Sequence, residues 1–178
     1  MKIALDAMGG DFAPFEIVRG AIDAVKAFPN IEVVLVGDEA RIYEVLKEFG
    51  QEKNPQLIIH HASEVIEMNE HPGTAVRKKK DASVIVATRL VKQKVCDAVI
   101  APGSTGAAVA AALFGLGRIK GIDRPMIATP IPTPQGVTVM LDSGANANCK
   151  PKHMVQGLLW APNMHDLCLA MKTLPSVC

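Results

Sequence analysis

Short apolar runs alternate along this chain with longer stretches in which apolar residues recur every three or four positions. The periodic stretches predict amphipathic helices over residues 14–28 and 39–49, one continuous helix over 74–94 and a fourth helix after Thr105. The short runs predict strands, most of which end in a glycine, an aspartate or a proline, over residues 2–7, 31–37, 56–60, 97–101 and 137–142.

The regular alternation of these elements predicts the fold class. Parallel strands need right-handed crossover connections, and helices that make these crossovers cover both faces of the sheet. We therefore expect an α/β fold with a mainly parallel sheet and helices on both faces. Ligands of such folds bind beyond the carboxyl ends of the strands. Candidate chemistry is accordingly sought in the loops that follow the predicted strands.

Composition excludes several classes of protein. The chain has 178 residues, 49% of them hydrophobic, which suffices for one core without disulfide bonds. Lysine and arginine number 19 against 18 aspartates and glutamates, so the net charge of +1 lacks the basic excess typical of nucleic-acid binders. The four cysteines form no Cys-x-x-Cys pair, and neither an export signal nor a membrane-spanning run is recognisable. These features predict a cytoplasmic protein with reduced thiols.

The loop after the first predicted strand places two glycines between two carboxylates. Asp6 is followed by Gly9, Gly10 and Asp11, and glycines let a ligand approach the backbone closely. Asp11 has an alternative role, because it could cap the helix that begins near Pro14. The Gly-x-Gly-x-x-Gly spacing of dinucleotide-binding loops is absent.

A second glycine loop follows the fourth predicted strand. Gly103, Ser104, Thr105 and Gly106 lead directly into a helix rich in small residues. Backbone amides, hydroxyl groups and the helix dipole there suit an anion such as phosphate, although the loop lacks the Gly-Lys-Ser/Thr ending of a Walker motif. The alternative is that Ser104 or Thr105 only caps the helix.

Polar residues also follow the last predicted strand. Asp142, Asn146 and Lys150 lie in this third loop, and Arg124 precedes the strand. A guanidinium group can bind phosphate with two parallel hydrogen bonds, and a lysine can neutralise an anion. A structural salt bridge for Arg124 and a solvated position for Lys150 are the alternatives.

A basic run lies on the predicted helix over residues 74–94. It consists of Arg77, Lys78, Lys79 and Lys80 and forms either a solvated face or a docking patch for an acidic partner. No histidine pair has the spacing of metal ligands, so we predict no metal site. A Gly-x-Ser-x-Gly nucleophile elbow is also absent. The residues therefore give no support for a covalent protein nucleophile.

Six segments, in this order and spacing, resemble the bacterial phosphate acyltransferase family known as PlsX. The resemblance runs from Met1 to about Gln156 and includes one departure, Ser104, where the family usually has asparagine. Both side chains donate hydrogen bonds, so we expect the change to be tolerated. The matching segments are residues 6–11, 61–66, 75–80, 104–107, 117–125 and 141–146.

The resemblance implies transfer of a fatty acyl group from acyl-acyl carrier protein to inorganic phosphate, which yields acyl-phosphate for phospholipid synthesis. It also implies a fold related to isocitrate dehydrogenases and phosphotransacetylases, no cofactor, and a full-length form that is a homodimer with peripheral membrane association. Phosphate would be the nucleophile. Candidate catalytic residues are then Arg124, Lys150 and Asp142. Candidate phosphate ligands are the residues named in the two glycine loops together with Asn146, and the basic run would receive the carrier protein.

The end of the chain departs from the family. Residues 1–156 are expected to be the N-terminal part of the acyltransferase fold, whereas residues 157–178 are atypical and contain Trp160, Cys168 and Cys178. Our hypothesis is a reading-frame error in this tail, and we expect the truncated chain to be inactive or weakly active. Two alternative functions remain open at this point. They are a phosphotransacetylase-like enzyme that uses acyl-coenzyme A and a phosphate-binding module without turnover.

Overall fold

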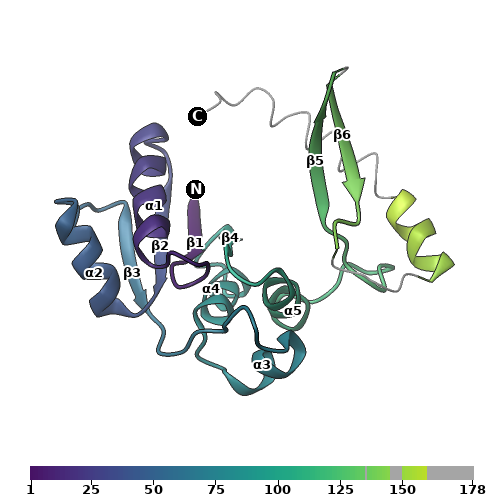
Figure 1. The fold of residues 1–178 in the computed structure, drawn as a ribbon, viewed down its shortest axis with the longest axis horizontal. Coiled ribbons are helices and arrows are strands. Elements are labelled where there is room, and N and C mark those ends of the chain that lie inside the picture. The colour runs from purple at the N-terminus through teal and green to yellow at the C-terminus, as the bar shows by residue number, and fades with distance from the viewer. Residues whose placement is uncertain (135, 145–149, 160–178) are drawn as a thin grey trace. The chain divides into compact units, whose positions relative to one another are not determined.

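A four-stranded parallel sheet organises the first 117 residues of the computed structural model, which describes residues 1–134, 136–144 and 150–159 (Figure 1). The strands stand in the order β3-β2-β1-β4, so the first strand of the chain lies inside the sheet. All three strand pairs are parallel, with Ile3 aligned to Val33 of β2 and to Ala98 of β4. The elements in chain order are β1 (Lys2–Asp6), α1 (Phe15–Ala27), β2 (Glu32–Gly37), α2 (Glu39–Glu48), β3 (Leu57–His61), α3 (Pro72–Lys78), α4 (Ser83–Lys92), β4 (Ala98–Ile100) and α5 (Thr105–Gly115).

Helices cover both faces of this sheet. Val33 and Leu35 of β2 pack in a cluster with α1 and α2, whereas Val34 and Val36 pack in a second cluster with α4. Successive side chains of a strand point to opposite faces, so a continuous apolar run is what a strand buried on both sides requires. The predicted α/β fold class is confirmed, as are the four predicted strands of this sheet and the helices corresponding to α1, α2 and α5.

The helix predicted over residues 74–94 is wrong as a single element. The structure divides it into α3 and α4, and the break between them falls at residues 79–82. Asp81 lies in this break, where its carboxylate accepts hydrogen bonds from the amide and the hydroxyl of Ser63 at 2.8 and 2.7 Å. Contacts with a distant segment therefore end α3, while the apolar periodicity continues through the break. A third apolar cluster joins α3, α4 and α5.

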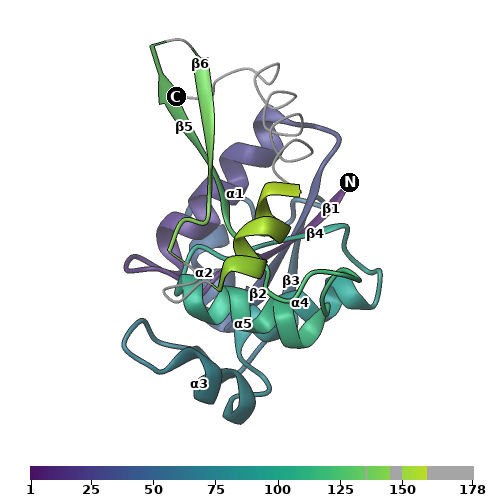
Figure 2. The ribbon, with the colours of Figure 1, turned by 90° about the vertical axis from the view of Figure 1, so that its right-hand side faces the viewer.

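Residues from 118 onward form a second compact unit. Its described part contains the antiparallel pair β5 (Ala128–Thr133) and β6 (Gly136–Leu141), visible as two long strands in Figure 2, and a helical stretch over residues 151–159. The strand predicted at 137–142 is confirmed as β6, but β5 was not predicted and forms a separate two-stranded sheet. Within the described residues, no helix is both long and apolar enough to cross a membrane.

Candidate functional site

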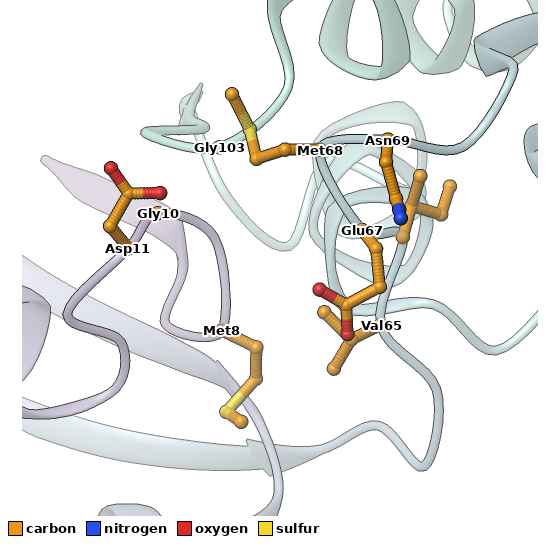
Figure 3. Close-up of a pocket in the computed structure, with 9 residues that line it drawn as sticks. Met8, Gly10, Asp11, Val65, Glu67, Met68, Asn69 and Gly103 are labelled. Carbon is orange, nitrogen blue, oxygen red and sulfur yellow. The ribbon is translucent and has the colours of Figure 1, made fainter.

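A cavity of about 500 Å³ opens at the carboxyl ends of β1, β3 and β4. The loop after β1 contributes Met8, Gly10 and Asp11, the loop after β4 contributes Gly103, and residues 65–69 form the opposite wall (Figure 3). The strand-end rule thus predicted the location and three lining residues. Residues 65–69 were not predicted as site residues, although Val65 and Ile66 lie in one of the segments that carry the family resemblance.

The two glycine loops meet through their backbones. A Cβ atom built on Gly9 would lie 2.8 Å from the nitrogen and 3.0 Å from the Cα of Gly103. The reciprocal Cβ on Gly103 would lie 2.9 Å from the Cα of Gly9. Neither position has room for a side chain. Gly10 has a φ angle of +103°, a conformation that other L-residues rarely adopt. Three of the predicted glycines are therefore required by geometry.

Asp6 stabilises the first glycine loop through hydrogen bonds to its buried side chain. Its side chain is buried, with the residue only 4% exposed, and its carboxylate accepts the amide of Met8 at 3.1 Å. Burial raises the pKa of Asp6, while hydrogen bonds from the Ser83 hydroxyl and from the amides of Met8 and Gly9 oppose that rise. The carboxylate thus uses loop amides that could otherwise face a ligand. The structure gives Asp6 and Gly9 a role in shaping the loop.

The walls of the cavity are apolar and acidic. The thioether side chains of Met8 and Met68 and the aliphatic side chain of Val65 line it, and the carboxylates of Asp11 and Glu67 lie on different walls (Figure 3). The described lining residues include no lysine, arginine or histidine. An anion bound here would find neutral donors in this lining, namely backbone amides and the side-chain amide of Asn69. The capping alternative for Asp11 is wrong, because α1 begins after Pro14, which is its N-cap residue.

The N-terminus of α5 adjoins Gly103. Ser104 is the N-cap residue, and its hydroxyl oxygen accepts the amide of Ala107 at 3.4 Å, so the capping alternative holds for Ser104. Amides in the first turn of a helix have no partner within the helix, which leaves those of Thr105 and Gly106 for other acceptors. A Cβ on Gly106 would lie 2.6 Å from the ring of Pro72, so this glycine also permits close packing of α5 against α3.

The basic run divides into inward and outward members. The ammonium group of Lys79 donates to the carbonyl oxygen of Val65 at 2.7 Å and to the Glu70 carboxylate at 2.6 Å. Arg77 lies over the ring of Phe114, 5.6 Å from its centroid, while its residue is still exposed. Lys78 and Lys80 are exposed on the surface. The prediction of a docking patch remains a prediction, and Lys78 and Lys80 are the members most accessible to it.

The candidate catalytic residues belong to the second unit. Asp142 accepts the amide of Ile127 at 2.7 Å and so fastens the end of β6 to the chain before β5. Arg124 and Lys150 are exposed. Asn146 lies outside the described residues. The structure places Arg124, Asp142 and Lys150 on a separate unit from the glycine loops, and their catalytic roles remain predictions.

A short network fastens the loop that contains Arg124. Asp123 forms a salt bridge of 2.6 Å with Lys152, and its amide donates to the side-chain oxygen of Gln156 at 3.2 Å. The amide nitrogen of Gln156 donates to the carbonyl oxygen of Gly121 at 2.9 Å. Among the described residues, no group of three or more histidine, cysteine, aspartate or glutamate side chains is placed to hold a metal ion.

Comparison with known proteins gives concordant results. Residues 1–161 match the model of a family described as fatty acid synthesis protein. The chain is 54% identical over 171 residues to a phosphate acyltransferase of Desulforamulus reducens, covering 94% of this chain and 50% of the relative. It is 56% identical over 156 residues to a phosphate acyltransferase of Desulfitobacterium hafniense, with coverages of 88% and 46%. The chain spans about half the length of these curated relatives.

Proposed function

Because this chain belongs to the fatty acid synthesis protein family, we propose that it is part of an enzyme that transfers a fatty acyl group from acyl-acyl carrier protein to inorganic phosphate. The product is acyl-phosphate, which enters phospholipid synthesis. The relatives named phosphate acyltransferase support the acceptor and the reaction class. Acyl carrier protein as the donor follows from the resemblance of the sequence motifs.

The observation that carries this proposal is the cavity where the two glycine loops meet. Gly9 and Gly103 bring the loop backbones into contact, and Gly10 and Gly103 line the cavity. Because the Asp6 carboxylate already accepts the amides of Met8 and Gly9, the amides of Gly10 and Gly103 are the proposed donors to a phosphate oxygen. The N-terminal turn of α5 adds a favourable dipole for an anion beside Gly103.

The reaction needs no nucleophile from the protein. A phosphate oxygen attacks the thioester carbonyl carbon, a carbon–oxygen bond forms, and the carbon–sulfur bond breaks. The thiolate of the carrier leaves and takes up a proton. Holding phosphate beside the thioester is worth about 7–11 kcal/mol in favourable cases. Each hydrogen-bond donor to the developing oxyanion contributes roughly 3–4 kcal/mol. The apolar walls at Met8, Val65 and Met68 suit the first methylene groups of the acyl chain.

Arg124, Lys150 and Asp142 are proposed to act in the same reaction. Arg124 and Lys150 are cations that would offset the charge of phosphate, and Asp142 holds its strand end in place. In the full-length enzyme, replacing Arg124 by Gln or Lys150 by Met should lower acyl-phosphate formation at least tenfold, because each change removes a cation that offsets charge on phosphate. Lys92→Met, on the exposed last turn of α4, is the matched control. Rates equal to that control would remove both residues from the proposed mechanism.

Docking of the acidic carrier protein is proposed at the exposed part of the basic run. Lys78→Glu combined with Lys80→Glu should weaken carrier binding and reduce its dependence on salt, because electrostatic steering is lost. The matched comparison is between the single variants Lys78→Glu and Lys92→Glu, because each reverses one positive charge and Lys92 lies on α4. The full-length form is further proposed to be a cytoplasmic homodimer that associates peripherally with membranes.

The reaction is tested with two donors and labelled inorganic phosphate. Acyl-carrier thioester and acyl-coenzyme A are incubated separately with this chain and with its full-length counterpart. Acyl-phosphate from the carrier thioester supports the proposal, whereas product from acyl-coenzyme A alone identifies a phosphotransacetylase-like enzyme. Phosphate binding without product from either donor identifies a binding module. We expect this chain to be inactive or weak beside the full-length enzyme, and equal turnover would contradict that expectation.

A further inference from the structure

We propose that Lys79 is a positioning residue that holds the wall of the cavity opposite the two glycine loops. The wall consists of residues 65–69, and Figure 3 shows Glu67, Met68 and Asn69 across the cavity from Gly10 and Gly103. The inference rests on the proposed function only in that the cavity is taken to be the substrate site. It also changes the role of Lys79, which the sequence pattern had assigned to a docking patch together with the rest of the basic run.

One ammonium group fastens this wall at both ends. Lys79 donates to the carbonyl oxygen of Val65, the first wall residue, at 2.7 Å. It also donates to the carboxylate of Glu70, the residue directly after the wall, at 2.6 Å. The side chains of Lys79 and Glu70 are 29% and 32% exposed, so the pair is partly buried. An ammonium that bridges the two ends of a short segment restricts the positions of all residues between them.

The same carboxylate continues the restraint into the wall. Glu70 accepts the amide of Glu67 at 2.9 Å, and the amide of Glu70 donates to the carbonyl oxygen of Glu67 at 3.2 Å. Lys79 therefore acts on Glu67 through Glu70. The hydrogen bond from Lys79 lowers the pKa of Glu70, which keeps the carboxylate ionised and able to accept both donors.

A separate set of contacts fastens the chain just before the wall. Asp81 accepts the amide and hydroxyl of Ser63, and its own amide donates to the Glu64 carboxylate at 2.9 Å. The backbone amide of Ser83 donates to the carbonyl oxygen of Glu64 at 3.0 Å. Loss of Lys79 should thus release residues 65–70 while Ser63 and Glu64 remain fixed. This separation makes the effect of Lys79 measurable by itself.

The wall is tested first by amide hydrogen exchange in the complete chain, with the amides of Glu67 and Glu70 as reporters. Lys79→Met should speed their exchange about fivefold or more, because local opening no longer has to break two charge-assisted hydrogen bonds. Lys79→Arg should restore protection, since a guanidinium can also donate to a carbonyl and a carboxylate together. Lys78→Met, which removes the charge of the preceding residue at the end of α3, should leave both amides unchanged. Exchange in β2 reports any general loss of stability.

Acyl transfer in the full-length enzyme is the second readout. Lys79→Met should raise KM for the acyl thioester at least threefold with a smaller change in kcat, and Lys79→Arg should reverse the rise. Unchanged exchange of the Glu67 and Glu70 amides in Lys79→Met would overturn the proposal, as would an equal increase throughout β2. A wild-type enzyme that forms no acyl-phosphate would instead refute the proposed function, and the exchange result would still decide the role of Lys79.

Discussion

Replacement of Gly9 by alanine tests whether the cavity is built by direct contact between the two glycine loops. The added Cβ would lie 2.8 Å from the Asp6 carboxylate and 2.8 Å from the backbone nitrogen of Gly103. Both neighbours are fixed, because Asp6 is buried and hydrogen-bonded and Gly103 contributes only backbone. The loops must therefore separate by several tenths of an ångström to reach ordinary contact distance.

The expected cost of this separation is that of overpacking a tight interior, about 1–3 kcal/mol in the free energy of unfolding. For a chain of this size, each kcal/mol lowers the melting temperature by roughly 2–4 °C. Thermal unfolding followed by circular dichroism measures the change. Gly103→Ala should cost a similar amount by itself. The double variant should cost less than the sum, because the first substitution has already separated the loops.

Gly20→Ala provides the matched control. Gly20 lies inside α1, and a Cβ added there would meet no atom within 4 Å. Alanine in a helix interior is more favourable than glycine by about 0.5–1 kcal/mol, so this variant should melt at a higher temperature. The reasoning is refuted if Gly9→Ala melts at or above the wild-type temperature, or if the two loop substitutions are strictly additive.

Three further predictions concern the interior of the first unit. Burial raises the pKa of Asp6, so folding favours the protonated side chain. The stability that this preference contributes is fully present below the unfolded pKa near 3.8, and it is lost as pH rises through the higher pKa of the folded state. The melting temperature of Asp6→Asn minus that of the wild type should accordingly increase between about pH 4 and pH 7, and a flat or falling difference contradicts this sign. Cys96 is 3% exposed and burial raises the pKa of its thiol, so peptide-resolved maleimide labelling should be much slower in the folded than in the urea-unfolded chain, and equal rates would place it at the surface. Ile42→Ala should lower the free energy of unfolding in urea by about 2–5 kcal/mol, because the side chain is fully buried, whereas Glu44→Ala on the exposed side of α2 should change it by less than about 0.5 kcal/mol.

The sequence patterns predicted the sheet well because its strands are buried on both faces. Continuous apolar runs such as residues 33–36 have few alternatives in a soluble protein, and the helices between them show clear periodicity. The break between α3 and α4 was missed because its cause lies outside the segment. Asp81 contacts Ser63, 18 residues earlier, and apolar periodicity does not record such contacts.

The second unit shows another limit of pattern reasoning. Pro130 and Pro132 lie in β5 and argue against a strand, since proline cannot donate to a sheet. They are tolerated because, among the residues that the structure describes, β5 pairs with β6 alone, so its other edge needs no donors within this sheet. From sequence alone, a segment that contains prolines is therefore predicted to be a loop, even where it forms a strand that pairs on one side.

Only part of the candidate site was predicted, because only some of its residues show a recognisable sequence pattern. The two glycine loops follow apolar strands and were found by position, with glycine, aspartate and hydroxyl residues marking them. Residues 65–69 carry no such mark, because Val65, Ile66 and Met68 look like ordinary apolar residues. Their contribution depends on Lys79, which the sequence presents as one charge among four neighbours.

The interior position of β1 has a consequence for the order in which the molecule folds. β1 is the first strand of the chain, yet the amide of Lys2 donates to the Asp97 carboxylate, 95 residues away. Closing so long a loop costs more chain entropy than the neighbouring pairing of β1 with β2, and a pairing between residues so far apart in sequence forms more slowly. The loop containing Gly103 directly follows β4, so it reaches Gly9 only when β4 has joined the sheet. Ligand binding should consequently appear late during refolding, after most helical signal has returned, and its appearance reports that the sheet is complete.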